Sequence, residues 1–156
     1  MALRKILVLG EDTLRKKSRP VTAFDDKLAA LLDDMAETLY DSGGAGLAAP
    51  QVGLLRRVVV IDVGEGLIEL VNPRIVHAEG EKEWLEGCLS VPGKVGRTHR
   101  PSVVRVEAQD RRGKPIVMEG EDYLALAFCH EIDHLDGKLY VDIAEGPLMD
   151  AESEED

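Results

Sequence analysis

The segment Leu126-Ala127-Phe128-Cys129-His130-Glu131-Ile132-Asp133-His134 contains a His-Glu-x-x-His pattern. Residues four apart lie on one face of a helix, so His130 and His134 can direct two imidazoles at one cation. Glu131 lies about 100° around the helix axis, within reach of a water on that cation. The pattern is a metal-hydrolase signature with the glutamate as general base, but two histidines can also simply cap or pack a helix. A hydrolytic metal would need a third protein ligand and an open position for water.

The composition indicates one globular domain. At 156 residues, with 44% hydrophobic and 31% charged residues, the chain is long enough for its own core. No apolar run approaches the roughly 20 residues of a membrane span. The apolar run in residues 1–9 is too short for a signal sequence because Gly10 and Glu11 end it. We therefore expect a cytoplasmic protein whose first residues form a strand-like start.

The net charge of −11 argues against a nonspecific grip on nucleic acid, because such a grip needs a basic surface. Basic residues do gather locally, and we interpret these groups as solvated faces: Arg4-Lys5, Arg15-Lys16-Lys17, Arg56-Arg57 and Arg111-Arg112.

Two cysteines, Cys88 and Cys129, permit one disulfide by count. Without a secretory context this is the less favoured use. A reduced cysteine could instead be the third metal ligand.

One helix is predicted from its spacing alone. Its apolar residues recur at i, i+3, i+4, i+7 and i+11, where Leu28, Leu31, Leu32, Met35 and Leu39 stand. Asp25 is a suitable N-cap, and Gly43 and Gly44 end the helix. This stripe belongs to the core and implies no chemistry.

The remaining chain predicts strands and loops. β-Branched runs and alternation predict strands at 57–63, 67–71, 74–78, 103–108 and 115–118. Pro92, Gly93 and Gly96 predict a loop. The order of helix, strands and helix indicates an α+β fold with mostly antiparallel sheets.

The last residues suggest a separate tail. Residues 145–156 hold six acids and no lysine or arginine. We expect them to form an acidic, disordered C-terminal tail after a single catalytic domain at 1–144.

Two further stretches carry candidate chemistry. Gly44-Ala45-Gly46-Leu47-Ala48-Ala49-Pro50-Gln51 is rich in small residues that let another backbone approach closely, and Gln51 offers a side-chain amide. Glu86-Gly87-Cys88-Leu89-Ser90 precedes the predicted loop. Alone, the first stretch would be only a tight turn. The two stretches and the His-Glu-x-x-His helix, in this order, resemble the bacterial peptide deformylase family from Ile6 to about Ile143.

The resemblance implies a fold, a metal and a reaction. The fold would be antiparallel sheets packed around a central metal-binding helix. Cys88, His130 and His134 would hold Fe(II), with Ni, Co or Zn able to substitute and water in the fourth position. The reaction would remove the formyl group from N-formylmethionyl nascent peptides. Cys129 matches no ligand position, and we expect it to pack in the core.

The resemblance also implies individual roles. Glu131 would take a proton from water and return it to the leaving amine. The Gln51 amide and the Leu89 N–H would bind the oxyanion. The substrate would add as a strand beside Gly46 and Gly87. The methionine pocket would be lined by Ala45, Trp84, Tyr123, Leu126 and Ala127, although Trp84 could also be an ordinary, partly buried aromatic residue.

Glu86 and Arg100 match a pair that forms a salt bridge in the family and would support the loop behind Cys88. A surface arginine without a partner is the alternative for Arg100.

This chain departs from the family at its end. Many members carry a long C-terminal helix that helps them dock on the ribosome, whereas here the end is acidic. An acidic tail is repelled by phosphates, so we expect little docking through it. A monomer is the default expectation.

Two other functions fit the His-Glu-x-x-His pattern, a zinc protease and a non-catalytic metal protein. Cys88 speaks against the first. Glu131 and Gln51 speak against the second.

Overall fold

The computed structural model describes residues 2–151. Its helices and strands follow one another in the order η1 (Asp12–Arg15), α1 (Asp26–Ser42), β1 (Gly46–Ala48), η2 (Ala49–Val52), β2 (Val58–Ile61), β3 (Ile68–Glu79), β4 (Lys82–Cys88), β5 (Val91–Arg100), β6 (Val103–Gln109), β7 (Pro115–Glu121), α2 (Tyr123–Leu135), η3 (Tyr140–Asp142) and β8 (Glu145–Asp150).

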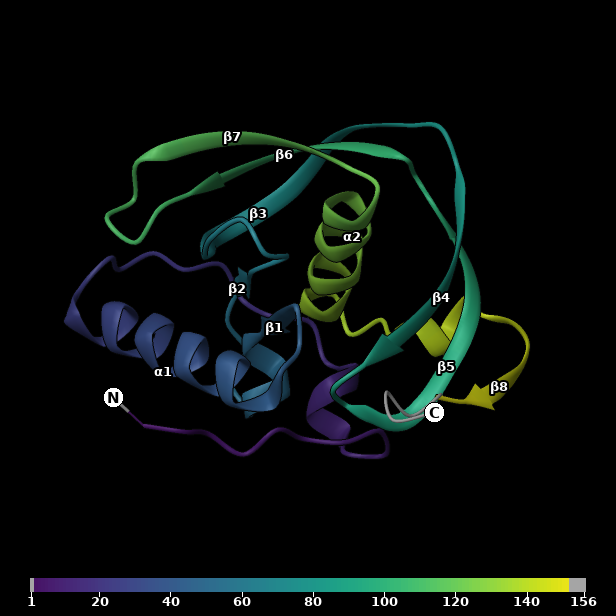
Figure 1. Cartoon of the computed structure of the whole chain (residues 1–156). Helices are drawn as coiled ribbons and strands as arrows, with labels where there is room; N and C mark the ends of the chain where they lie inside the picture. The colour runs from purple at the N-terminus through teal and green to yellow at the C-terminus, as the bar shows by residue number, and fades with distance from the viewer. Residues whose placement is uncertain (1, 152–156) are drawn as a thin grey trace.

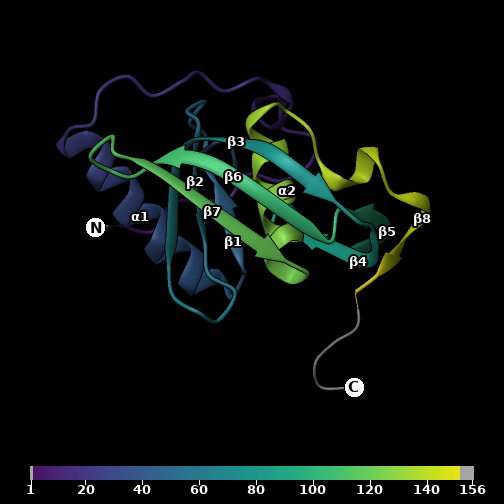
Figure 2. The same cartoon turned by 90° about the horizontal axis from the view of Figure 1, so that it is seen from above.

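Two antiparallel sheets surround α2. The five-stranded sheet has the order β1-β2-β3-β6-β7, and the three-stranded sheet has the order β4-β5-β8. Figure 1 shows α2 between the two sheets, and Figure 2 shows β3, β6 and β7 crossing over it. The predicted α+β class with mostly antiparallel pairing around a central helix is therefore confirmed.

The strand β2 contributes side chains to two apolar clusters, one on each face of the five-stranded sheet. Its four residues are all buried, and successive side chains point to opposite faces. Val58 and Val60 pack with the apolar stripe of α1, whereas Val59 and Ile61 pack against α2. A strand buried on both faces reads as a continuous β-branched run, which is what the sequence shows.

The helix α1 forms where its spacing predicted. The side chain of Asp25 accepts a hydrogen bond from the Leu28 N–H at 3.1 Å, and Gly43 ends the helix with φ of 75°. Each fully buried leucine of the stripe contributes roughly 1.5–3 kcal/mol relative to an exposed one.

The N-terminal segment is not a strand, contrary to expectation. Residues 2–9 run beside α1 and η2, where the Arg4 N–H donates to Thr38 Oγ1 and the Leu7 N–H donates to the Gln51 carbonyl. These partners belong to helices, so no ladder of a sheet can form.

The loop predicted at residues 92–96 is also wrong, because β5 continues through it. Gly96 pairs with Glu86 of β4. A Cβ at Gly96 would lie 2.9 Å from Ala144 Cβ and 3.1 Å from Tyr140 Cε1. The glycine thus permits close packing beneath a strand. From sequence alone, such a glycine cannot be distinguished from a turn glycine.

The prediction of a disordered acidic tail is wrong for residues 145–150, which form β8 beside β5. Leu148 packs into a cluster with Tyr140, and the acids Glu145 and Asp150 meet His99 and Lys94. Composition suggested disorder because it does not show that these acids have basic partners across the ladder. The rest of the expected tail, residues 152–156, lies outside the described residues. No helix among residues 2–151 is long and apolar enough to cross a membrane.

Candidate metal centre and catalytic cleft

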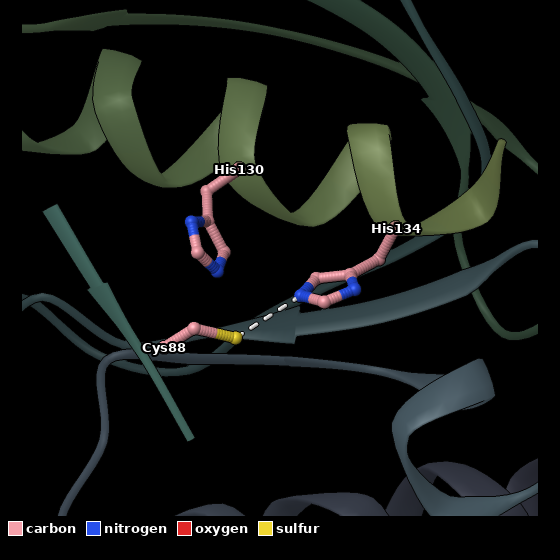
Figure 3. A group of neighbouring side chains, drawn as sticks. All are labelled: Cys88, His130 and His134. Carbon is pink, nitrogen blue, oxygen red and sulfur yellow. Dashed lines mark hydrogen bonds between the residues drawn. The ribbon is translucent and has the colours of Figure 1, made fainter. Parts of the chain in front are cut away.

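Three side chains converge beside α2. His130 and His134 stand one turn apart on the helix, and both rings point toward Cys88 at the end of β4 (Figure 3). One ligand atom from each residue lies within 4.8 Å of the other two. The Cys88 Sγ and His134 Nε2 atoms are 3.3 Å apart. Within residues 2–151 this is the one group of histidine, cysteine and acidic residues with such spacing.

The donor set fits a transition-metal ion. A carboxylate oxygen of Glu86 bonds the Nδ1 atom of His130, which fixes the tautomer with a free lone pair on Nε2. Burial lowers the pKa of His134 to about 3, so its ring is neutral and able to ligate at pH 7. One sulfur and two imidazole nitrogens are ligands that zinc, iron and similar ions accept.

Glu86 is the centre of a buried polar network behind the metal ligands. Its carboxylate accepts two hydrogen bonds from Arg100, at 2.9 and 2.8 Å, and one from Thr98 at 2.8 Å. A third arginine N–H donates to Asp133 at 2.8 Å. Burial alone would raise the pKa of Glu86, but His130 and Arg100 lower it to about 2. The carboxylate therefore stays charged and holds His130 in place.

Glu131 lies on the cleft side of the two histidines. Its Oε2 atom is 4.0 Å from His130 Nε2, and its Oε1 atom is buried without a hydrogen-bond partner in the described chain. Burial raises the pKa of this carboxyl to about 7. A group that titrates near neutral pH can both accept and return a proton.

Gln51 is buried directly behind Cys88. The Ala48 N–H donates to Gln51 Oε1 at 2.9 Å, which directs the amide nitrogen toward Ser90 Oγ at 3.0 Å and Cys88 Sγ at 3.6 Å. The Ser90 N–H also donates to Cys88 Sγ at 3.4 Å. These two hydrogen bonds hold the Cys88 sulfur in place at the end of β4.

A cavity of about 540 Å³ lies in front of these groups. Trp84 and Tyr123 contact each other on its wall, with ring centroids 5.9 Å apart. Of the residues proposed from sequence, the cavity is lined by Ala45, Gly46, Trp84, Glu86, Gly87, Cys88, Leu89, Tyr123, Leu126, Ala127, His130 and Glu131. Gln51, Arg100 and His134 do not line it, and Gln51 and Arg100 instead contact Cys88 and Glu86 of its wall.

Some participants were missed by sequence reasoning. Asp62, Val63 and Leu85 also line the cavity. Asp133 could have been found, because it lies three residues after His130 and hence on the same side of the helix. Thr98 and Ser90 carry no such signal, since only the pairing of β4 with β5 brings Thr98 to Glu86.

Cys129 faces away from this centre. It belongs to the apolar cluster between α2 and the five-stranded sheet, and burial raises the pKa of its thiol to about 11. Both cysteines are free thiols.

Comparisons with known proteins agree with this geometry. The family model described as polypeptide deformylase matches residues 3–147. The chain is 54% identical to a peptide deformylase from Thermoanaerobacter pseudethanolicus over 155 residues, covering 99% of this chain and 98% of the relative. It is 58% identical to one from Acetivibrio thermocellus over 142 residues, covering 91% and 84%.

Solved structures of the same name are similar in shape. A peptide deformylase from Thermotoga maritima has a TM-score of 0.90 at 40% identity, covering 92% of this chain and 99% of that one. One from Legionella pneumophila has a TM-score of 0.89 at 49% identity, covering 92% and 86%.

Proposed function

The chain belongs to the polypeptide deformylase family, and from that premise we propose which of its residues carry the reaction. The protein is a metal-dependent hydrolase that removes the formyl group from the N-terminal formylmethionine of newly synthesised proteins and releases formate. The observation that carries the assignment of roles is the Cys88-His130-His134 group with Glu131 beside it at the cavity. A zinc protease and a non-catalytic metal protein, both compatible with the motif alone, are thereby set aside.

Cys88, His130 and His134 are proposed to hold Fe(II), with Ni, Co or Zn able to substitute. The thiolate and two imidazoles support a transition metal, and the family resemblance favours iron. When bound, the ion supplies Lewis acidity and lowers the pKa of a water molecule.

Glu131 is proposed as the proton carrier. Its free Oε1 atom takes a proton from the attacking water and then delivers it to the nitrogen of the leaving amine. A carboxyl with a pKa near 7 loses little free energy in either direction at neutral pH.

Gln51 and Leu89 are proposed to bind the oxygen of the formyl group as it gains negative charge. Gln51 donates through Nε2, which the Ala48 N–H orients through the other end of the amide. Leu89 donates through its backbone N–H at the cavity wall. One preorganised donor of this kind contributes about 2.7–4 kcal/mol to stabilising the transition state.

The peptide is proposed to lie as a strand between the two sheets. β1 forms one edge of the five-stranded sheet, and β4 forms one edge of the three-stranded sheet. Gly46 and Gly87 lie on these open edges and both line the cavity, so their backbones can pair with an extended substrate. The methionine side chain then enters the pocket of Ala45, Trp84, Tyr123, Leu126 and Ala127.

We propose that the protein acts in the cytoplasm, where nascent peptides are its substrates. We also propose that it is a monomer. We further propose that its C-terminus contributes little to ribosome docking, because residues 145–156 contain six acids and no lysine or arginine and such a segment is repelled by phosphate. Tight ribosome binding that disappears when the residues after Glu145 are deleted would refute this point.

The proposed function is tested by formate release from an N-formylmethionyl tripeptide. The protein is purified without oxygen and loaded with Fe(II) or Ni(II), and metal-free protein serves as the control. We expect release only from the loaded protein. No release from folded, loaded protein would contradict the assignment.

A further inference from the structure

Five basic residues form a group on three chain segments that meet at the C-terminal end of α2. This group, the basic strip, consists of Lys16, Lys17, Arg19, Arg56 and Lys138. All but Arg56 are exposed, and Arg56 is partly exposed. None of the five has an acidic partner within 4.0 Å among residues 2–151.

Three chain segments hold the strip together. The Ser18 N–H donates to the Leu135 carbonyl at 2.7 Å, at the end of α2. Arg19 pairs with Arg56 in a short parallel bridge, and the Arg57 N–H donates to the Arg19 carbonyl at 3.1 Å. The purple segment in Figure 1 accordingly passes close to the lower end of α2.

Gly137 fixes the position of the third segment, which follows α2 and carries Lys138. It adopts φ of +76°, and a Cβ at this position would clash with the Arg15 carbonyl oxygen. The backbones of residues 15–16 and 137 are therefore in direct contact, which brings Lys138 beside Lys16.

The backbone also points the charges outward. Ser18 is buried, and in extended chain the residues on either side of a buried one face the opposite way. Lys17 and Arg19 therefore project into solvent together.

The nearest acids do not neutralise the strip. Asp142 is bonded to Arg15 at 2.7 Å, and Asp136 is bonded to Arg57 at 3.0 Å. Asp133, whose carbonyl accepts from the Lys138 N–H at 3.0 Å, is bonded to Arg100 at 2.8 Å, and Glu11 and Asp12 lie at the start of η1. The strip is thus a local positive surface on a chain whose net charge is −11.

We propose that the basic strip docks the enzyme onto folded RNA at the surface of the ribosome. A rigid set of lysines and arginines matches an array of phosphates, and binding releases the counterions condensed there. This partner rests on the proposed function, because the substrate emerges from a ribosome. The cavity is lined by the part of α2 from Tyr123 to Glu131, whereas the strip lies beyond His134, so docking leaves the cleft open. The basic groups around Lys16-Lys17 and Arg56, which the sequence suggested were solvated faces, are here proposed to form a binding surface.

The test is co-sedimentation of the metal-loaded protein with ribosomes over a series of KCl concentrations. The strip variant is K16Q/K17Q/R19Q. The matched control K27Q/R112Q/K114Q removes the same charge from three exposed residues that also lack an ion pair in the described chain, but that stand near acids such as Asp25 and Asp110. Formate release from the tripeptide is measured for every protein.

We expect the strip variant to bind at least about tenfold more weakly, with the slope of log K against log salt reduced by about two to three. The control should bind like the wild type, and all three proteins should release formate alike. Equal weakening of both variants, or no binding by the wild type, would overturn the proposal. So would binding to ribosomes without binding to purified ribosomal RNA, or equal binding to anionic lipid vesicles. Loss of formate release by the wild type would instead count against the proposed function alone.

Discussion

At the scale of single residues, Gly46 leaves the space that Glu131 occupies. A Cβ at Gly46 would lie 2.5 Å from Glu131 Oε2, closer than real contacts allow. We predict that Gly46→Ala displaces the carboxylate and lowers kcat about 100-fold, because a misplacement near 1 Å costs that much. Steady-state kinetics of the metal-loaded variant, with its urea unfolding curve, measures this. A kcat equal to that of the wild type would show that Glu131 tolerates the shift.

Glu86 bonds His130, one of the proposed metal ligands, and pairs with buried Arg100. Glu86→Gln keeps the size of the side chain but removes its charge. We predict about 10–100-fold weaker metal affinity, as for other residues that orient a ligating histidine. We also predict lower stability, because buried Arg100 then keeps only Asp133 as a counter-charge. Competition with a chelator measures the affinity, and an unchanged affinity would mean that Glu86 does not orient His130.

At the scale of elements, local signals predicted α1 but not β8. The spacing and the cap of α1 lie within the helix itself. β8 depends on partners far along the chain, since Lys94 pairs with Asp150 and Val95 with Met149. The same holds for the site: the motif placed the two histidines on one face, but Thr98 reached Glu86 only through the β4–β5 register.

The two faces of β8 give a matched test of this strand. Leu148 packs into the cluster with Tyr140, whereas Met149 is an exposed neighbour. We predict that Leu148→Ala destabilises the protein by about 1–3 kcal/mol and that Met149→Ala changes stability by less than about 0.5 kcal/mol. Urea unfolding of both variants decides between a packed strand and a loose tail. Equal, small effects would indicate the loose tail.

At the scale of the whole molecule, the N-terminal segment connects distant elements, and Asp34 of α1 anchors its start. Asp34 accepts from the Ala2 N–H at 2.8 Å and from Arg4 Nε at 3.1 Å. The hydrogen bond from Ala2 lowers the pKa of Asp34, and it outweighs burial, which acts in the opposite direction. Arg4 lowers this pKa further. A lowered folded pKa gives stability that is fully present above the unfolded pKa, about 3.9, and is lost as pH falls through the folded value.

We therefore predict that Asp34→Asn is less stable than the wild type at pH 7 and that the difference shrinks as pH falls below about 4. Asp41→Asn on the same helix is the control, because Asp41 is exposed and no ion pair to it occurs in the described chain. Urea midpoints at several pH values measure both. A stability difference between Asp34→Asn and the wild type that grows as pH falls would contradict a lowered pKa of Asp34 in the folded protein.

We propose that Glu131 moves the proton while Cys88, His130 and His134 hold the metal. The decisive experiment measures metal content and formate release in Glu131→Ala and in the wild type, prepared and loaded side by side. We predict the same metal content in both proteins and formate release that is about 100–10,000-fold lower in the variant. Formate release comparable to that of the wild type in the metal-loaded variant would contradict it.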